Sequence, residues 1–457
     1  MVRVHLDERV RSNRTYKLAY LYALNLLSRM FPYTQFEAIS DQPLLIVPWG
    51  TGSPLATDQS AELTLVFGNS SLAGSQGRIV TANCLDWAVY IDSSVEANPN
   101  ECWNPALALL TACYAVARTT QVLLGNSVEQ ENWGPFSILD FKDGRVDFDW
   151  SRRWKLGEAY LAGIGAIGSS FLYSLVAHGC AEGKLVLVDH DRLEASNLGR
   201  YTFFDVNDVP MHKTIAAKAR LDDLRLPLRI ETVEDRFEHY FNEAHNADSQ
   251  FRVETLISAP DKRATRRAFQ RTLPNGMWDA STGPSQVILH TNKFDPTHAC
   301  TECIYPETPE EHAHDRHVAD TLNVDIGRVQ SGEPINESDA ERIIERYPEH
   351  RKEQLMGKAF ESIFGILCST GELRVARGII HAPFSFVSGL AGVLLYFELV
   401  KSSAPDVFRP FQDFNYVQLN PFRQPNPEFR ELRASRKGCM CQQEAFRTVY
   451  SRIWGGA

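Results

Sequence analysis

The stretch 161–213 combines a glycine pattern with a carboxylate in a way that predicts nucleotide binding. Gly163, Gly165 and Gly168 form GxGxxG between an apolar run and an expected helix. Glycines there let backbone N–H groups and a helix N-terminus approach phosphate. Asp189 follows about 20 residues later at the end of a second expected strand, where a carboxylate binds ribose hydroxyls.

Three further polar residues decide which nucleotide is expected, namely Asn197, Arg200 and Lys213. An NAD-dependent oxidoreductase needs the acidic residue and little else nearby, and it stays a remote alternative. ATP that is consumed in acyl adenylation needs cations on its triphosphate and a carboxylate that holds Mg²⁺. Asp261, after a further expected strand, supplies that carboxylate. The set therefore favours ATP with Mg²⁺ over NAD.

Strands and helices alternate around these residues, as in an open parallel α/β sheet. The expected strands are Lys155–Leu161, Leu185–Asp189, Arg229–Val233, Val253–Ala259 and Ser285–Leu289, and a helix runs from Lys213 to Leu224. In such sheets, ligands bind beyond the carboxyl ends of the strands. Gly163–Gly168, Asp189 and Asp261 are therefore expected to meet around one ligand.

The first third of the chain is also of α/β type but has no glycine fingerprint. A buried helix is expected from Ser12 to Met30, and another begins at the N-cap Asn104 with Pro105 in its first position and ends near Gly125. The expected strands are Leu44–Val47, Leu63–Phe67, Arg78–Val80, Ala88–Ile91 and Phe136–Phe141. We interpret residues 1–150 as a domain that binds no nucleotide itself.

Four cysteines form two close pairs, a CxxC of Cys300 and Cys303 and a CxC of Cys439 and Cys441. Four thiolates are typical of a structural Zn²⁺ site, in which no coordination position is left for water. A redox pair and idle thiols are the alternatives. Zinc here would tie the tail of the chain to the sheet.

A polar segment at 305–380 is too long for a loop and is interpreted as an insertion. Ser338 and Glu341 predict a capping box, and hence a helix, inside it. His312, His314 and His317 with Asp315 are interpreted as a polar loop and not as a metal site. Cys368 lies beside a Ser-Thr-Gly turn, where an exposed thiol is expected, although a buried cysteine is the alternative.

Composition bounds the remaining classes of function. The 457 residues include 44% hydrophobic residues and carry a formal net charge of −10, which gives no general attraction to nucleic acid or membrane. The chain begins without a signal-peptide pattern, and the apolar stretch Ala382–Val400 is expected to be a buried helix and not an anchor. Nine unevenly placed cysteines favour the reducing cytoplasm.

The run VLVDHDRLEASNLGRY resembles the signature of the ubiquitin-activating enzyme superfamily, which includes the ThiF/MoeB-like adenylyltransferases. The resemblance extends to Lys213, Asp261, CTECIYPE from Cys300, the Ala-Pro-Phe helix start at 382–384 and the terminal cysteine pair. It covers about 151–310 and 380–442. It implies two Rossmann-like halves in one chain, with an inactive half at 1–150 and an active half at 151–457 that carries the 305–380 insertion.

The resemblance also implies a role for each site residue. The residues that would contact the nucleotide are Gly163, Gly165, Gly168, Asp189, Asp191, Asn197, Arg200 and Lys213. Asp261 would hold Mg²⁺. The first half would lend an arginine to the active half, and Arg14 in the run RSNR is the candidate.

The implied activity is formation of an acyl-adenylate at the C-terminal glycine of a ubiquitin-like protein. A thioester on Cys368 and transfer to a conjugating enzyme would follow. The alternative is an adenylyltransferase for a sulfur-carrier protein that forms no thioester. A catalytically inactive scaffold is a further alternative.

Overall fold

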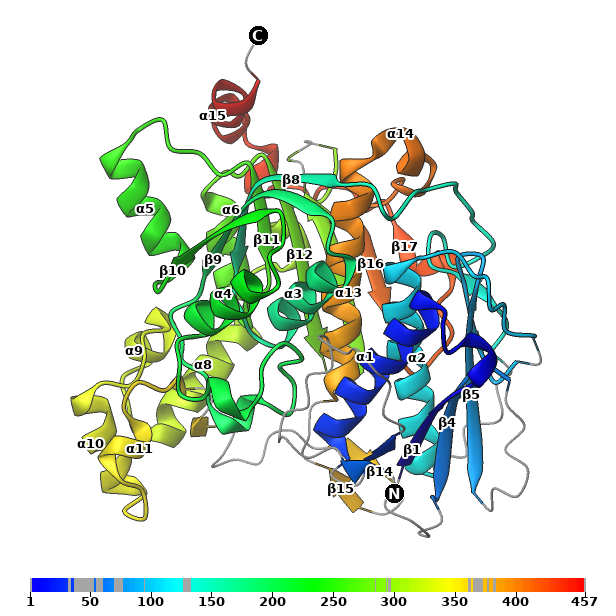
Figure 1. Ribbon diagram of the computed structural model, residues 1–457. Helices are drawn as coiled ribbons and strands as arrows, with labels where there is room; N and C mark the ends of the chain where they lie inside the picture. Colours follow the sequence, from blue (N-terminus) through cyan, green and yellow to red (C-terminus); the bar gives the residue numbers. More distant parts are fainter. Residues whose placement is uncertain are drawn as a thin grey trace. The chain divides into compact units, whose positions relative to one another are not determined.

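The computed structural model of the chain describes residues 2–31, 34–36, 53–54, 61–69, 77–93, 95–125, 133–283, 285–292, 294, 297–360, 363–364, 373–375, 378–380 and 384–455. Contacts divide the chain into two compact units. Unit 1 contains residues 1–305 and 384–457, and unit 2 contains residues 306–383. Both large sheets belong to unit 1 (Figure 1).

The first sheet has seven strands in the order β3-β2-β1-β4-β5-β6-β7. These strands are β1 (Val2–Leu6), β2 (Thr34–Phe36), β3 (Ser53–Pro54), β4 (Leu63–Phe67), β5 (Arg78–Leu85), β6 (Ala88–Ile91) and β7 (Phe136–Ser137). Pairing is parallel from β3 to β5 and antiparallel from β5 to β7. All five residues of the central strand β4 are buried, as expected for a parallel strand that is covered on both faces.

The second sheet has eight strands in the order β10-β9-β8-β11-β12-β13-β16-β17. These strands are β8 (Trp154–Ala162), β9 (Ala181–Val188), β10 (Leu228–Val233), β11 (Thr255–Ser258), β12 (Gly276–Gly283), β13 (Gln286–Asn292), β16 (Tyr416–Leu419) and β17 (Arg430–Glu431). Pairing is parallel from β10 to β12 and antiparallel beyond. The first seven strands follow the order of the first sheet, so the predicted α/β fold with two similar halves is confirmed.

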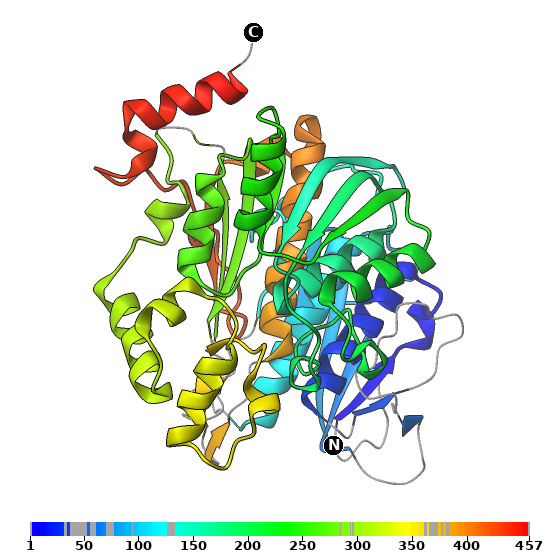
Figure 2. The same ribbon diagram turned by 90° about the vertical axis from the view of Figure 1, so that its left-hand side faces the viewer.

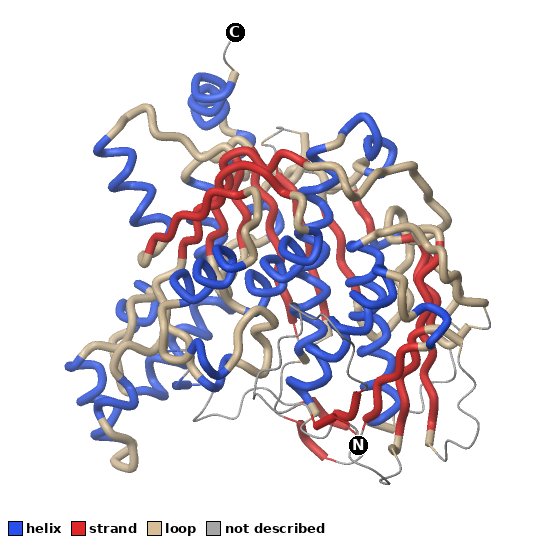
Figure 3. Tube along the Cα trace, in the orientation of Figure 1, coloured by secondary structure: helices blue, strands red, loops and turns tan. Residues whose placement is uncertain are grey.

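Long helices occupy the region between the two sheets (Figure 3). They are α1 (Arg14–Met30), α2 (Pro105–Leu123), α3 (Ala166–His178) and α13 (Ser385–Ser403). Among the described helices, α2 and α13 are long and apolar enough to span a membrane, but 83% and 94% of their apolar windows are buried within the protein. The expected burial of the apolar helix near the C-terminus is therefore confirmed.

The other helices of unit 1 connect strands or lie in the C-terminal segment. They are α4 (Lys213–Asp223), α5 (Phe237–Ala247), α6 (Arg263–Arg271), α7 (Thr301–Ile304), α14 (Pro405–Phe408) and α15 (Glu444–Trp454), with short 3-10 turns η1 (Glu8–Val10), η2 (Ala195–Asn197), η3 (Val206–Asp208), η4 (Arg409–Phe411), η5 (Pro427–Phe429) and η6 (Met440–Gln442). Helix α15, red in Figure 2, is attached by Tyr450 and Trp454, which donate to the carbonyls of Asn275 and Leu273 at 2.8 Å each.

Unit 2 is mainly helical and has its own apolar core. Its described elements are α8 (Pro309–Leu322), α9 (Ile326–Ser331), α10 (Glu337–Arg346), α11 (Lys352–Leu355), β14 (Leu373–Val375) and β15 (Gly378–Ile380). The core includes Val318, Leu322 and Ile343, which are fully buried. A cluster of this kind explains why the segment forms a compact unit and not an open loop.

Several sequence predictions of local structure were wrong in detail. The histidines at 312–317 lie on helix α8 and not in a loop. The capping box of α10 is formed by Asn336 and Asp339 and not by Ser338. The expected strand at 136–141 ends after Ser137, because the chain turns and Phe141 adopts a φ of +63°. The strand that was expected at 44–47 lies outside the described residues.

Candidate active site

The glycine loop joins β8 to α3, and its glycines meet different steric demands. Gly163 has a φ of +96°, and a Cβ there would lie 2.7 Å from the carbonyl oxygen of Ala259. A Cβ on Gly168 would overlap the Gly163 carbonyl. Gly165 is the N-cap of α3 and has more room, since its Cβ would come no closer than 3.7 Å to the hydroxyl of Tyr201. The fold itself therefore requires two of the glycines, while the third leaves the helix N-terminus open.

Asp189 directly follows β9 and fixes the glycine loop. Its carboxylate accepts a hydrogen bond from the backbone N–H of Ile164 at 2.6 Å and another from that of Asp191 at 2.9 Å. The side chain is buried. Because Ala162, Val188 and Ser258 share one row of the sheet, this carboxylate lies at the same edge as the loop. The predicted convergence of the loop and Asp189 is present in the structure.

Lys213 is the first residue of α4, and its ammonium group is buried beside two carboxylates. Its Nζ lies 2.7 Å from Asp191 Oδ2 and 3.6 Å from Asp189 Oδ1. Burial opposes the charged form, but Asp189, Tyr201 and Asp191 outweigh it and hold the pKa of Lys213 well above its ordinary value. Burial likewise opposes ionisation of Asp191, yet Lys213 and His190 keep the pKa of that carboxyl low. The site thus holds a permanent cation at neutral pH.

Asn197 and Arg200 lie on the segment that crosses from η2 toward α4. The Asn197 Oδ1 accepts a hydrogen bond from the backbone N–H of Glu194 at 3.0 Å, so this side chain shapes the turn. Arg200 is half-buried, and its guanidinium makes no hydrogen bond or ion pair with the residues that the structure describes. Arg200 is therefore a cation in this region that is free to bind an anion.

Asp261 is exposed and follows the end of β11. Behind it, Asp279 on β12 accepts hydrogen bonds from Ser258 Oγ and Arg266 Nη1 at 2.5 Å each. Asp279 Oδ2 is buried without a partner among the described residues. Asp279 and Arg266 were missed by the sequence prediction, because β12 contains glycine and aspartate and does not resemble a buried strand.

The structure does not bring Arg14 to this edge of the sheet. Arg14 begins α1 and stacks on the ring of Trp103 at 4.1 Å. Burial raises the pKa of the Cys180 thiol, and the nearby charge of Arg14 opposes that rise. Cys180 precedes β9 and lies at the opposite end of that strand from Asp189. The segment that carries Arg200 meets the other end of α1, where Arg29 contacts Leu198. At a rise of 1.5 Å per residue, Arg14 lies roughly 22 Å from Arg29 along the helix.

Cys368, the predicted thioester cysteine, lies outside the described residues. The His312, His314 and His317 side chains form no metal-type cluster in the described part of the chain. His314 and His317 instead meet the ring of Phe364 edge-on, with centroids 5.7 and 5.3 Å away.

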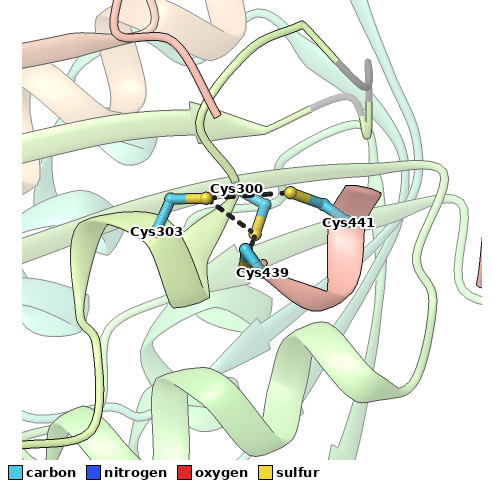
Figure 4. Close-up of side chains that lie close together, drawn as sticks. All are labelled: Cys300, Cys303, Cys439 and Cys441. Carbon is cyan, nitrogen blue, oxygen red and sulfur yellow. Dashed lines mark hydrogen bonds between the residues drawn. The ribbon is translucent and has the colours of Figure 1, made fainter. Parts of the chain in front are cut away.

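The four paired cysteines converge at one place (Figure 4). Cys300 Sγ lies 3.7 Å from Cys303 Sγ and 3.5 Å from Cys439 Sγ, and Cys303 Sγ lies 3.7 Å from Cys441 Sγ. All four sulfur atoms lie within 4.8 Å of one another. Zinc–sulfur bonds of about 2.3 Å in a tetrahedron require sulfur separations of about 3.8 Å. The donor set therefore fits Zn²⁺.

Two donors that face this cysteine cluster suit thiolates and not disulfides. Gln270 Nε2 donates to Cys300 Sγ at 3.3 Å, and the backbone N–H of Arg436 donates to Cys303 Sγ at 3.1 Å. The tail is also attached by backbone hydrogen bonds from Ala299 to Arg433 and from Ser435 to Thr297. The cluster thus joins the end of the chain to the segment that follows β13.

Comparisons with known proteins agree on one family. The model of the ThiF family matches residues 145–443. A Sinorhizobium fredii protein, y4jF, is 27% identical over 66% of this chain and 59% of its own length. The sulfur carrier protein adenylyltransferase of Thermus thermophilus is 27% identical over 36% of this chain and 61% of its own length. Ubiquitin-like modifier-activating enzyme 5 of Caenorhabditis elegans is 26% identical over 32% of this chain and 37% of its own length. The chain thus spans less than two thirds of each of these relatives.

Proposed function

The chain belongs to the ThiF family, and from this premise we propose that it adenylates the C-terminal glycine of a ubiquitin-like or sulfur-carrier protein with ATP. The observation that supports the proposal is a set of three groups at or next to one sheet edge. They are an open helix N-terminus at Gly165, a buried cation at Lys213 and a free cation at Arg200. An oxidoreductase needs no such cations beside its dinucleotide.

In the proposed complex, the glycine loop faces the nucleotide phosphates and Asp189 faces the ribose. Arg200 and Lys213 neutralise the phosphates, with Asn197 holding the turn that precedes Arg200. When the glycine carboxylate attacks the α-phosphorus, a P–O bond forms, the bond to the β-phosphate oxygen breaks, and pyrophosphate leaves. Two anions approach each other in this step, so preorganised positive charge lowers its barrier.

Asp261 is the proposed Mg²⁺ ligand, because it is exposed at the strand end and makes no hydrogen bond with described residues. Bound Mg²⁺ would supply charge neutralisation on the phosphates. Buried Asp279 behind it is compensated by the Arg266 guanidinium, which leaves Asp261 as the exposed carboxylate after β11.

Pyrophosphate exchange into ATP tests the adenylation step. We expect exchange with Mg²⁺ and a ubiquitin-fold protein that ends in glycine, and no exchange when that glycine is deleted. Arg200→Ala should reduce the exchange about a hundredfold or more, as for a lost electrostatic contact to the transition state. An Arg271→Ala variant, which removes a surface ion pair to Glu302 on α7, is the matched control. Absence of exchange with every such partner, together with tight NAD binding, would contradict the proposal.

A thioester on Cys368 is the finer proposal. The Cys368 thiolate would attack the acyl-adenylate carbonyl, form a C–S bond and release AMP, after which a conjugating enzyme would accept the acyl group. The compact form of residues 306–383 supports a separate task for this unit. On a gel, the thioester between the enzyme and its partner protein should appear as a band that thiols remove. Cys368→Ala should abolish this band and leave pyrophosphate exchange intact. A band that persists would assign the step to another cysteine, and a wild-type protein that forms no band would favour the sulfur-carrier alternative.

We also propose that Cys300, Cys303, Cys439 and Cys441 hold a structural Zn²⁺. Measurement of bound metal should give about one zinc per chain. The Cys439→Ser, Cys441→Ser double variant should lose that zinc and melt at a lower temperature. Cys84→Ala and Cys113→Ala, at buried cysteines outside the cluster, should keep their zinc. A wild-type protein that is purified without metal and takes up none would contradict this assignment.

A further inference from the structure

Arg29, in the last turn of α1, is a buried cation that reaches from the first half into the second. Its Nη1 donates to the carbonyl of Leu198 at 2.5 Å, and its Nη2 donates to the carbonyl of Phe204 at 3.0 Å. Its Nε donates to Asn25 Oδ1 at 2.7 Å. No described carboxylate pairs with it. Its partners are therefore mainly backbone oxygens of the segment 198–204.

A buried guanidinium without a carboxylate partner is costly unless its donors are satisfied. Burial lowers the pKa of Arg29 to about 9, so the group is still charged at neutral pH. Hydrogen bonds from a charged donor are stronger than those between neutral groups. The carbonyls of Leu198 and Phe204 therefore compensate the Arg29 charge. The same hydrogen bonds fix the positions of these carbonyls.

The two carbonyls that accept hydrogen bonds from Arg29 belong to Leu198 and Phe204, and Arg200 and Tyr201 lie between these residues in the sequence. Between them, Asn25 Nδ2 donates to the carbonyl of Thr202 at 2.9 Å. The Thr202 hydroxyl also lies 3.0 Å from Ser170 Oγ on α3, the helix that the glycine loop begins. Three backbone carbonyls and one hydroxyl of this short segment are thus fixed by side chains of the buried helices α1 and α3.

We infer that Arg29 is a positioning residue that holds the 198–204 segment so that Arg200 faces the nucleotide edge of the second sheet. The inference rests on the proposed adenylation function. Arg29 does not contact the nucleotide and acts through Arg200. It gives the first half a task in the reaction although that half has no glycine loop of its own.

The chain that directly follows the segment 198–204 is fixed by ion pairs inside the second half. Arg220 on α4 binds Asp205 at 2.6 Å and Asp208 at 2.7 Å. This ion-pair cluster begins where the contacts of Arg29 end, so Arg29 and Arg220 hold successive parts of one segment. Among the described residues, the hydrogen bonds from α1 to this segment reach Leu198, Thr202 and Phe204, the part that carries Arg200.

The test compares Arg29→Met and Arg29→Lys with Leu18→Ala, a buried change on the same helix away from the segment. Amide hydrogen exchange should rise at 198–204 in Arg29→Met, and the KM for ATP in the exchange reaction should rise about tenfold or more. Arg29→Lys keeps the charge and should recover part of both effects. Leu18→Ala should lower the melting temperature with neither effect.

A double variant separates positioning from general instability. In an Arg200→Ala background, Arg29→Met should cost much less exchange activity than in the wild-type background, because its effect passes through Arg200. Equal losses in both backgrounds, or hydrogen exchange at 198–204 that matches Leu18→Ala, would overturn the inference. If the wild-type protein shows no pyrophosphate exchange, adenylation fails as the function, while protection at 198–204 still decides whether Arg29 holds the segment.

Discussion

The two halves share a strand order but differ at the position where the first and fourth strands end. In the second half, Gly163 follows β8 and Ala259 follows β11, and the two residues are in close contact. In the first half, the register places Asp7 after β1 and Gly68 after β4. A Cβ on Gly68 would overlap that of Asp7. Each half therefore has one glycine at this contact, but on opposite strands.

The side that carries the glycine determines what occupies the strand end. With glycine on the first strand, no side chain blocks the approach to the helix that follows, and the backbone stays available for phosphate. With glycine on the fourth strand, the Asp7 side chain occupies the space. It is buried and accepts hydrogen bonds from Arg9 Nη2 at 2.8 Å and the backbone N–H of Asn69 at 2.9 Å. The Asp7 carboxylate thus occupies the position at which the second half has space for a bound anion such as phosphate.

The connection to the following helix reinforces this difference. In the second half, three residues separate β8 from α3, and the helix N-terminus points at the strand end. In the first half, residues 7–13 intervene, and the N-terminus of α1 is capped by the side chain of Asn13, which accepts from Thr15 and Tyr16. A capped helix N-terminus has fewer free N–H groups for a phosphate. The shared topology therefore carries an uncapped helix N-terminus at the strand end in the second half and a capped one in the first.

The largest effect is expected from Gly168→Ala in the second half. The new Cβ would overlap the Gly163 carbonyl, and backbone cannot move aside as a flexible side chain can. The free energy of unfolding should fall by about 3 kcal/mol or more, at or beyond the usual range for overpacking, and ATP binding should be lost. Thermal unfolding and calorimetric titration with ATP measure the two effects.

Gly165→Ala is the matched variant, because there a Cβ has room and the φ of −81° suits any residue. Stability should change by less than about 1 kcal/mol, while ATP affinity falls about tenfold through crowding at the helix N-terminus. If Gly165→Ala binds ATP as the wild type does, the phosphates do not approach this loop.

The second largest effect is expected from Lys213→Met, which removes the buried cation of the second half. Asp189 would lose its compensating charge, and Asp191 would lose its closest partner. Breaking a buried pair costs about 3 kcal/mol or more, and exchange activity should disappear with it. Urea unfolding and pyrophosphate exchange measure these losses.

Lys184→Met on β9 is the control for that change. Lys184 pairs with Glu158 and Glu231 near the surface, and such pairs contribute about 1 kcal/mol or less. Its exchange rate should match that of the wild type. Equal activity of Lys213→Met and Lys184→Met would show that the buried cation has no part in the reaction.

Patterns confined to one element were predicted well from the sequence. Strand β4 and strand β6 begin and end where the apolar runs predict, and α2 begins after Asn104, whose side chain accepts from the backbone N–H of Leu107. These signals are local, because an apolar run or a capping residue acts on its own neighbours. Strand β1 was missed, since Arg3 and His5 alternate with its buried residues and give the segment a charged appearance.

Features that depend on two distant segments were not predictable in the same way. The resemblance of the run RSNR implied an arginine that serves the other half, but the direction of α1 places Arg14 away from the segment 198–204 and places Arg29 against it. An arginine in the last turn of a largely apolar helix gives no sign of a partner 169 residues away. Asp7 likewise looks like a surface charge until the pairing of β1 with β4 puts it against Gly68.

The smallest effect is expected from Asp7→Ala, which removes the internal anion of the first half. Burial opposes ionisation of Asp7, but Arg9 and the N–H of Asn69 outweigh it and keep its pKa below the ordinary value of 3.8. A lowered carboxyl pKa stabilises the fold above pH 3.8 and loses that contribution as the pH falls through the folded-state pKa. Asp7→Ala should therefore cost about 1–2 kcal/mol at neutral pH, and the difference from wild type should shrink in acid.

ATP affinity should not change in Asp7→Ala, because Asp7 lies in the half that we do not expect to bind nucleotide. Asp222→Ala, which breaks an exposed pair with Lys218 on α4, is the control and should show little loss at any pH. Denaturation followed at pH 7 and near pH 3.5, with ATP titration at pH 7, makes the comparison. If Asp7→Ala gained a second ATP site, the Asp7 side chain would be what closes the first half. If Asp7→Ala weakened ATP binding in the second half, the strand ends of the two halves would be coupled. The first half could then not be described as an independent copy of the same site that the Asp7 side chain fills.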